Sequence, residues 1–91
     1  MANKENLLSF EIMKIIYDEG AKFLYPERED GFQRIRHILG GALEGLGTSL
    51  ATAKTSDFRK LYHRGWNDVV DELVPYEAQD RVTERFRKLV F

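Results

Sequence analysis

The pattern of apolar and polar positions is clearest between Ser56 and Val74. Along this stretch apolar positions recur every three or four residues, as on one face of a helix, and most positions between them are polar. The positions of the apolar face are Phe58, Leu61, Tyr62, Gly65, Trp66, Val69, Val70 and Leu73. The pattern predicts one continuous helix over residues 56–74, with Ser56 as its N-cap.

The same period predicts three further helices, separated by breaks at Pro26 and Pro75 and by a short turn before Ser56. Asn3 or Asn6 can cap the first of them. No run of residues shows the alternation typical of a strand. The predicted fold is therefore all-α, a compact four-helix bundle-like domain over residues 1–91 with helices at about 4–24, 31–53, 56–74 and 76–90.

The first predicted helix is more apolar than a helix on the outside of a bundle requires. Such a helix needs about a third of its surface apolar, whereas apolar residues cover roughly two-thirds of this one. Either the helix lies at the centre of the bundle, or it also contacts another molecule. For the second alternative, Phe10, Met13 and Tyr17 are the candidate contact residues.

The second predicted helix has one face made of small residues, among them Gly41, Gly45 and Thr48. The spacing of the two glycines is the one that lets two helix backbones approach closely. Four glycines, at roughly 1 kcal/mol each relative to alanine, also weaken the helix, so a kink or break near 40–41 or 45–47 is the alternative. Together with the apolar first helix, this face predicts self-association, most simply as a symmetric dimer. The predicted oligomer interface consists of Gly41, Gly45, Thr48, Phe10, Met13 and Tyr17.

Composition narrows the classes of function. The chain has no cysteine, which excludes disulfides, thiolate metal sites and a cysteine nucleophile. His37 and His63 are the only histidines, and neither lies in a sequence pattern of a metal or catalytic site. Glu44 stands isolated among glycines and is expected to point to solvent. We therefore expect no enzymatic activity, no metal and no cofactor.

Charge and the N-terminal sequence bear on the environment of the protein. Fourteen Lys and Arg against fifteen Asp and Glu give a net charge of −1, which argues against a surface that binds nucleic acid or an anionic membrane as a whole. Glu11, Lys14 and Asp18 interrupt the first apolar stretch, so it cannot span a membrane. There is no pattern of a secretory signal. A cytoplasmic protein without a membrane association is the expectation.

The charges of the predicted helix 56–74 run against the helix dipole. Basic residues occupy its first half and acidic residues its second half, whereas the dipole favours the opposite order. Each departure costs only a few tenths of a kcal/mol, so one interpretation is that the helix simply tolerates this order. The alternative is that the departures mark a functional surface, and the basic half is then the candidate site for an acidic protein partner. The residues of this predicted site are Arg59, Lys60, His63, Arg64 and Asn67.

The sequence thus favours a small non-enzymatic protein–protein interaction module of a regulatory, adaptor or inhibitor type that forms homo-oligomers. One alternative is a DNA-binding regulator, in which the turn Lys54–Ser56 leads into 56–74 as the recognition helix of a helix-turn-helix. Another is a structural subunit of a larger assembly. Trp66 is expected in the core, with a partner contact as its alternative.

Overall fold

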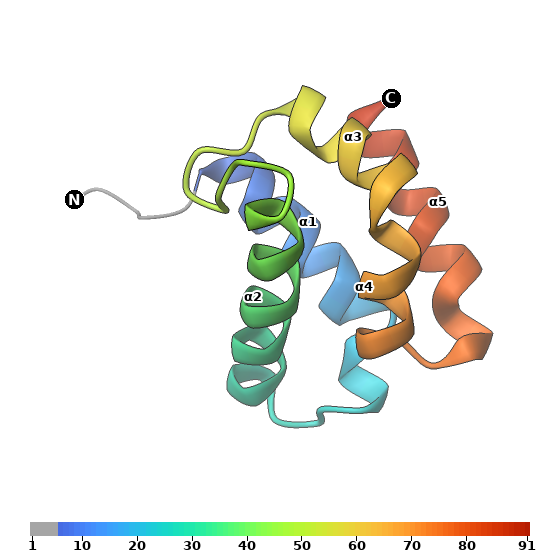
Figure 1. Ribbon diagram of the computed structural model, residues 1–91. Coiled ribbons are helices and arrows are strands. Elements are labelled where there is room, and N and C mark those ends of the chain that lie inside the picture. The colour runs from blue at the N-terminus through green and yellow to red at the C-terminus, as the bar shows by residue number, and fades with distance from the viewer. Residues whose placement is uncertain (1–5) are drawn as a thin grey trace.

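The computed structural model describes residues 6–91, and within this range it contains five α-helices, two 3-10 turns and no strand (Figure 1). The predicted all-α class is confirmed. None of the described helices is long and apolar enough to cross a membrane. The elements in chain order are α1 (Leu7–Glu19), η1 (Ala21–Phe23), α2 (Arg28–Glu44), α3 (Thr55–Arg64), α4 (Trp66–Leu73), η2 (Tyr76–Ala78) and α5 (Gln79–Val90).

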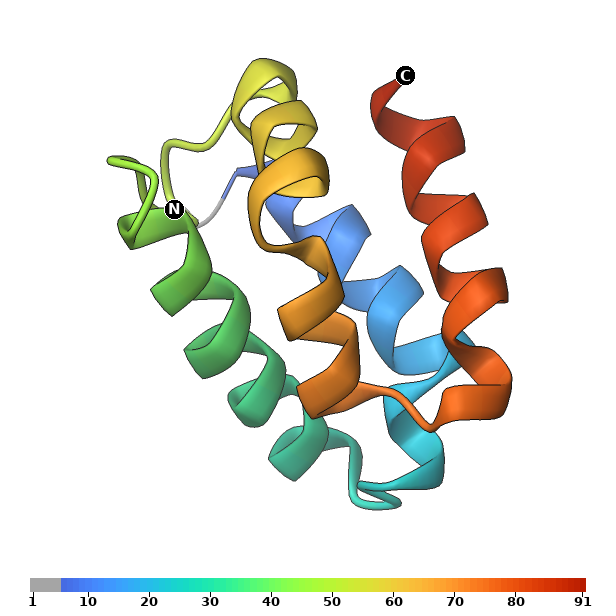
Figure 2. The ribbon, with the colours of Figure 1, turned by 45° about the vertical axis from the view of Figure 1, so that its right-hand side comes forward.

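The helix α1 lies at the centre of the arrangement. It contacts α2 on one side and α5 on the other, and Figure 2 shows α3 and α4 in front of it. Met13 is fully buried, and only 5% of Tyr17 is exposed. The high apolar content of this helix therefore reflects its central place. The prediction that Met13 and Tyr17 form part of an oligomer interface is wrong, because both lie in the protein's own core.

The first helix is capped at Asn6 and ends at Glu19, five residues before its predicted end at 24. The Asn6 side chain accepts a hydrogen bond from the backbone N–H of Ser9 at 2.7 Å, which satisfies a free donor of the first turn. At the other end, Gly20 packs against the connection after α4, where an added Cβ would lie 2.6 Å from Val74 Cγ1. The chain then continues into η1 before Pro26.

The second helix begins at Arg28 and ends at Glu44, not at 53. The Thr48 N–H donates to Leu43 O at 3.1 Å and the Gly47 N–H donates to Glu44 O at 3.0 Å, the pair of bonds that ends a helix in a Schellman motif. Gly47, with φ of 90°, is the left-handed residue that this ending requires. The predicted alternative of a break near 45–47 is therefore confirmed.

The loop 45–54 folds back over the start of α1. The buried hydroxyl of Ser9 donates to Leu50 O at 2.7 Å, and the Asn6 amide nitrogen donates to Ala53 O at 2.6 Å. Leu50 and Ala53 are themselves buried. The segment predicted to be helical is thus held in a loop by two side chains from α1.

The stretch 56–74 is two helices and not one, because the chain breaks at Gly65 between α3 and α4. The residue after the break, Trp66, is 1% exposed, and its ring stacks on Phe86 of α5 at 3.8 Å between centroids. Its indole N–H donates to Thr83 Oγ1 at 2.8 Å. The prediction of one continuous helix is wrong, whereas the expected core position of Trp66 is what the structure shows.

Candidate functional site

The break at Gly65 changes the electrostatic argument for a site. In α3, Asp57 lies in the first turn, and His63 and Arg64 lie in the last turn, which is the order that the helix dipole favours. In α4, Asp68 lies in the first turn. In α3 the order of charges therefore follows the dipole, whereas α4 still carries Asp71 and Glu72 in its last turn. The dipole argument no longer marks the basic residues of α3 as functional.

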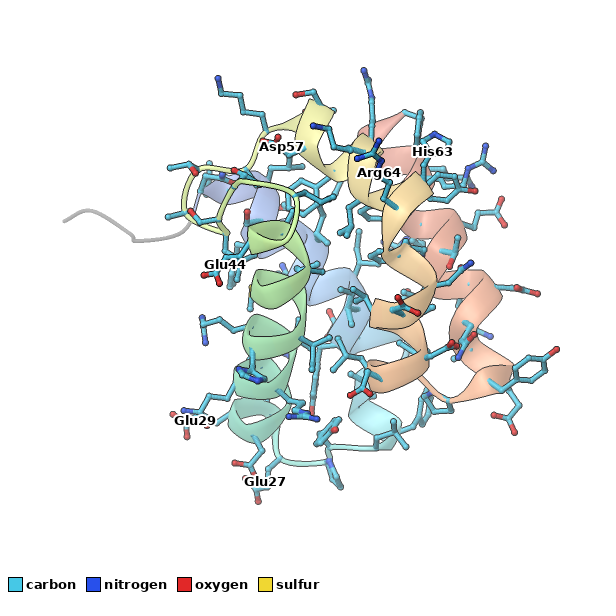
Figure 3. All side chains as sticks on the ribbon, viewed as in Figure 1. Glu27, Glu29, Glu44, Asp57, His63 and Arg64 are labelled. Atoms are coloured by element: carbon cyan, nitrogen blue, oxygen red, sulfur yellow. The ribbon has the colours of Figure 1, made fainter. Side chains whose placement is uncertain are left out.

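The basic residues of α3 lie on two flanks of that helix. Arg59 and His63 face the last turn of α5, where both approach the Phe91 ring. Arg64 faces α2 and lines a groove on that side. Lys60 is exposed between the two flanks. Figure 3 shows Arg64 on the α2 side of His63, so the predicted cluster is divided between two surfaces.

On the α5 flank, Arg59 stabilises the end of the neighbouring helix. Its Nε–H donates to Val90 O, a carbonyl of the last turn of α5. Its guanidinium also lies 5.6 Å from the centre of the Phe91 ring, within the range of a cation–π contact. His63 approaches the same ring with 6.2 Å between centroids. The residue predicted as a partner contact thus also has a structural role.

Arg87 from α5 extends this flank. Its guanidinium lies 5.6 Å from the ring centre of Tyr62, and the Tyr62 and Phe91 rings are 5.5 Å apart. We call this surface the basic-aromatic face; its members are Arg59, Tyr62, His63, Arg87 and Phe91, with the exposed Lys60 at its edge. Among residues 6–91, no carboxylate forms an ion pair with any of its cations. Arg87 and Phe91 were missed as site residues because no local pattern links them to α3.

The other flank opens into a groove of about 330 Å³ between α2 and α4, which we call the α2–α4 groove. Its lining residues are Ile38, Ala42, Gly45, Leu46, Arg64, Gly65, Asp68, Val69 and Glu72. Glu72 forms an ion pair with Arg34 at 3.4 Å, but Arg64 and Asp68 pair neither with each other nor with another described residue. The groove therefore combines apolar lining with two unpaired charges of opposite sign.

Asn67 belongs to neither surface by its contacts. It is exposed in the first turn of α4, and its side chain makes no hydrogen bond with residues 6–91. Its predicted role in partner binding stays a prediction.

The remaining members of the predicted oligomer interface are accessible but scattered. Phe10 is 43% exposed and packs on Phe32 of α2 with 6.3 Å between ring centroids. Gly41 lies on the outer side of α2, where an added Cβ would meet nothing within 4 Å. Gly45 lines the α2–α4 groove, and Thr48 is half-buried in the following loop. The structure thus separates Phe10 from the small-residue face and leaves both open to contacts.

The helix-turn-helix arrangement that the DNA-binding alternative requires is not present. The motif joins its two helices by a turn of three or four residues, whereas the ten residues 45–54 separate α2 from α3. That loop packs against α1 through the hydrogen bonds of Asn6 and Ser9. The predicted recognition helix therefore does not follow α2 in the geometry of that motif.

The described chain contains few side chains arranged as possible catalytic groups or metal ligands. An open depression of about 570 Å³ is lined by His37 together with Tyr25, Asp30, Gln33 and Arg34. No group of three or more His, Asp or Glu side chains in residues 6–91 is arranged to hold a metal ion. The expectation that the protein is not an enzyme stays a prediction.

Glu44 is exposed at the end of α2, in line with the expectation that it points to solvent (Figure 3).

Comparison with known proteins identifies no relative: no protein-family model, no curated protein and no solved structure matches this chain.

Proposed function

We propose that this protein is an interaction module whose basic-aromatic face binds an acidic segment of another protein. The observation that carries the proposal is the meeting of cations from two helices around partly exposed aromatic rings, with no carboxylate of residues 6–91 paired to them. A regulatory, adaptor or inhibitor role requires a binding surface of this kind and no catalytic group.

The face has the features of a contact that carries binding energy. Arginine and aromatic side chains are enriched among residues that contribute most to protein interfaces. Arg59 and Arg87 each lie over a ring, which restrains the guanidinium before a partner arrives and lowers the entropy lost on binding. Phe91 is 57% exposed and offers an apolar contact between them. Lys60, at the edge, favours the approach of an acidic partner.

A protein segment fits this face better than a nucleic acid does. The net charge of the chain is −1, whereas proteins that bind nucleic acid have a pronounced basic excess. An acidic peptide with interspersed aromatic or apolar residues can pair with the cations and cover the rings of Tyr62 and Phe91.

The test is fluorescence anisotropy with a labelled peptide of alternating glutamate and tyrosine, and a glutamine–tyrosine peptide as its uncharged counterpart. We expect the purified protein to bind the acidic peptide, with an affinity that falls as salt is raised. The double variant Lys60→Glu, Arg87→Glu should weaken binding about tenfold or more, equivalent to about 1.4 kcal/mol. Arg59 is left intact because it also stabilises α5.

The matched control is Lys22→Glu, Arg81→Glu, which changes the net charge equally but acts outside the face, in η1 and the first turns of α5. It should bind as the unaltered protein does. Equal loss in both double variants, or equal binding of both peptides, would contradict the proposal. Tighter retention of duplex DNA than of the acidic peptide at the same salt would favour nucleic acid as the partner.

A further inference from the structure

We propose that the α2–α4 groove of one copy of this chain receives Phe10 on α1 of a second copy. The inference goes beyond the binding of an acidic partner, because it uses a different surface. It rests on three observations: a groove lined by both apolar and charged residues, a partly exposed aromatic side chain on α1, and charges of opposite sign beside each that form no ion pair within residues 6–91.

The groove can accept an aromatic ring. Ile38, Ala42 and Val69 supply apolar lining, and the space of about 330 Å³ is open at the surface. Gly45 and Gly65 line the groove without contributing a side chain. One recurring mode of protein recognition places the apolar face of an amphipathic helix in a hydrophobic groove between helices, and the apolar part of this lining suits that mode.

The helix α1 presents a matching stripe on its outer side. The members of the stripe are spaced three, four and seven residues apart, which places them on one helical face; they are Leu7, Phe10, Glu11 and Lys14. Leu7 is 77% exposed and Phe10 is 43% exposed, whereas Ile12, Met13, Ile16 and Tyr17 of the same helix are buried. Two adjacent exposed apolar side chains on an otherwise core helix are what a docking contact requires.

The charges of the two surfaces are complementary. Glu11 directly follows Phe10, and Lys14 lies one helical turn beyond it, with its Nζ 5.8 Å from the Phe10 ring centre. Within residues 6–91, no ion pair involves Glu11, Lys14, Arg64 or Asp68. With Phe10 in the groove, Glu11 pairs with Arg64 and Lys14 pairs with Asp68. Charges left unpaired in one copy are thereby paired between two.

The contact joins two different surfaces, so it is heterologous and leaves one anchor and one groove free at the ends of a pair. It also specifies which members of the predicted oligomer interface take part. Phe10 and Gly45 do, whereas Gly41 lies on the outer side of α2 and is not among the residues that line the groove.

The first test uses the two glycines of α2 as a matched pair. Gly45 has ordinary right-handed backbone angles (φ −63°, ψ −19°), and an added Cβ would lie 3.4 Å from Ala42 O, so Gly45→Leu fills the groove without backbone strain. Gly41→Leu makes the same change one turn earlier, in open space. Sedimentation equilibrium should show a species larger than 10.6 kDa for the unaltered protein and for Gly41→Leu, but a monomer for Gly45→Leu.

The second test is complementation. Phe10→Ser removes the anchor and Glu11→Lys reverses its charge, and circular dichroism shows whether each variant remains folded. Each should be monomeric alone. Each of these variants retains a usable groove, and Gly45→Leu retains the Phe10 anchor. A mixture of Phe10→Ser with Gly45→Leu should therefore form a pair of about 21 kDa, twice 10.6 kDa. Glu11→Lys together with Arg64→Glu in one chain should regain the association that each single change weakens.

A monomeric unaltered protein at high micromolar concentration would overturn the inference. So would equal loss of association in Gly41→Leu and Gly45→Leu, a mixture that stays monomeric, or no recovery in the charge-swapped chain. Binding of the acidic peptide by monomeric Gly45→Leu keeps the two proposals distinct, because the basic-aromatic face is intact in that variant. Loss of peptide binding without loss of association would instead contradict the proposed function alone.

Discussion

Among the described residues, Ser9 is the one polar or charged residue that is buried. It is fully buried, and its hydroxyl donates to Leu50 O at 2.7 Å. A buried carbonyl without a donor costs free energy, so this one hydroxyl stabilises the path of the loop 45–54. Nothing in the apolar period of the first helix distinguishes Ser9, because its partner lies 41 residues away.

Ser9→Ala should therefore destabilise the protein by about 1–3 kcal/mol, since it leaves Leu50 O buried and unpaired. Urea unfolding followed by circular dichroism measures the change in the free energy of unfolding. Ser49→Ala is the control, because that hydroxyl bonds only to Thr52 Oγ1 in an exposed position. A loss for Ser49→Ala as large as for Ser9→Ala would contradict this explanation.

At the scale of elements, two glycines of the second predicted helix have different effects because their environments differ. Gly47 ends α2 with φ of 90°, a conformation that other residues adopt at a cost. Gly41 lies inside α2 with open space around it and contributes only flexibility. The sequence shows both as glycines of one predicted helix, and it cannot tell which of them ends it.

The two positions should respond to alanine in opposite directions. Gly41→Ala should stabilise the protein by about 0.5–1 kcal/mol, because alanine favours the helix interior. Gly47→Ala should destabilise it by about 1–2 kcal/mol, because alanine is strained at positive φ. Thermal melts of both variants and of the unaltered protein measure the order of their melting temperatures. If Gly47→Ala melted above Gly41→Ala, Gly47 would not be the left-handed residue that terminates α2.

At the scale of the whole molecule, three segments far apart in sequence converge at Gly20. An added Cβ there would lie 2.6 Å from Val74 Cγ1 and 3.0 Å from Val82 Cγ2, so the end of α1, the connection after α4 and α5 leave no room for a methyl group. This packing requires a residue without a side chain directly after the end of α1. It also brings α5 beside α1, where Arg85 pairs with Glu19 at 2.7 Å.

Gly20→Ala should cost about 1–3 kcal/mol, the usual range for an overpacked core. Val74→Ala removes the nearest methyl groups, so the double variant Gly20→Ala, Val74→Ala should lose less stability than the sum of the two single changes. Denaturant unfolding of the three variants forms a double-mutant cycle. Strict additivity would show that the Val74 side chain is not what excludes a methyl group at this position.

By itself, the sequence determined the all-α class and most of the core. The period of three and four residues is local, and positions such as Phe58, Leu61 and Leu73 are buried as that period indicates. It also led to Arg59 and Arg64 as exposed cations, although by an argument from the dipole that the break at Gly65 removes.

Only the tertiary structure decided where the helices break and which surfaces result. Trp66 packs on Phe86 and bonds to Thr83, contacts that hold the break between α3 and α4 but involve residues of another helix. The basic-aromatic face depends on Arg87 lying over Tyr62, and the α2–α4 groove depends on which side of α3 Arg64 takes. Helical period reports which residues share a face, whereas a site needs residues from several helices, and their meeting is determined by packing.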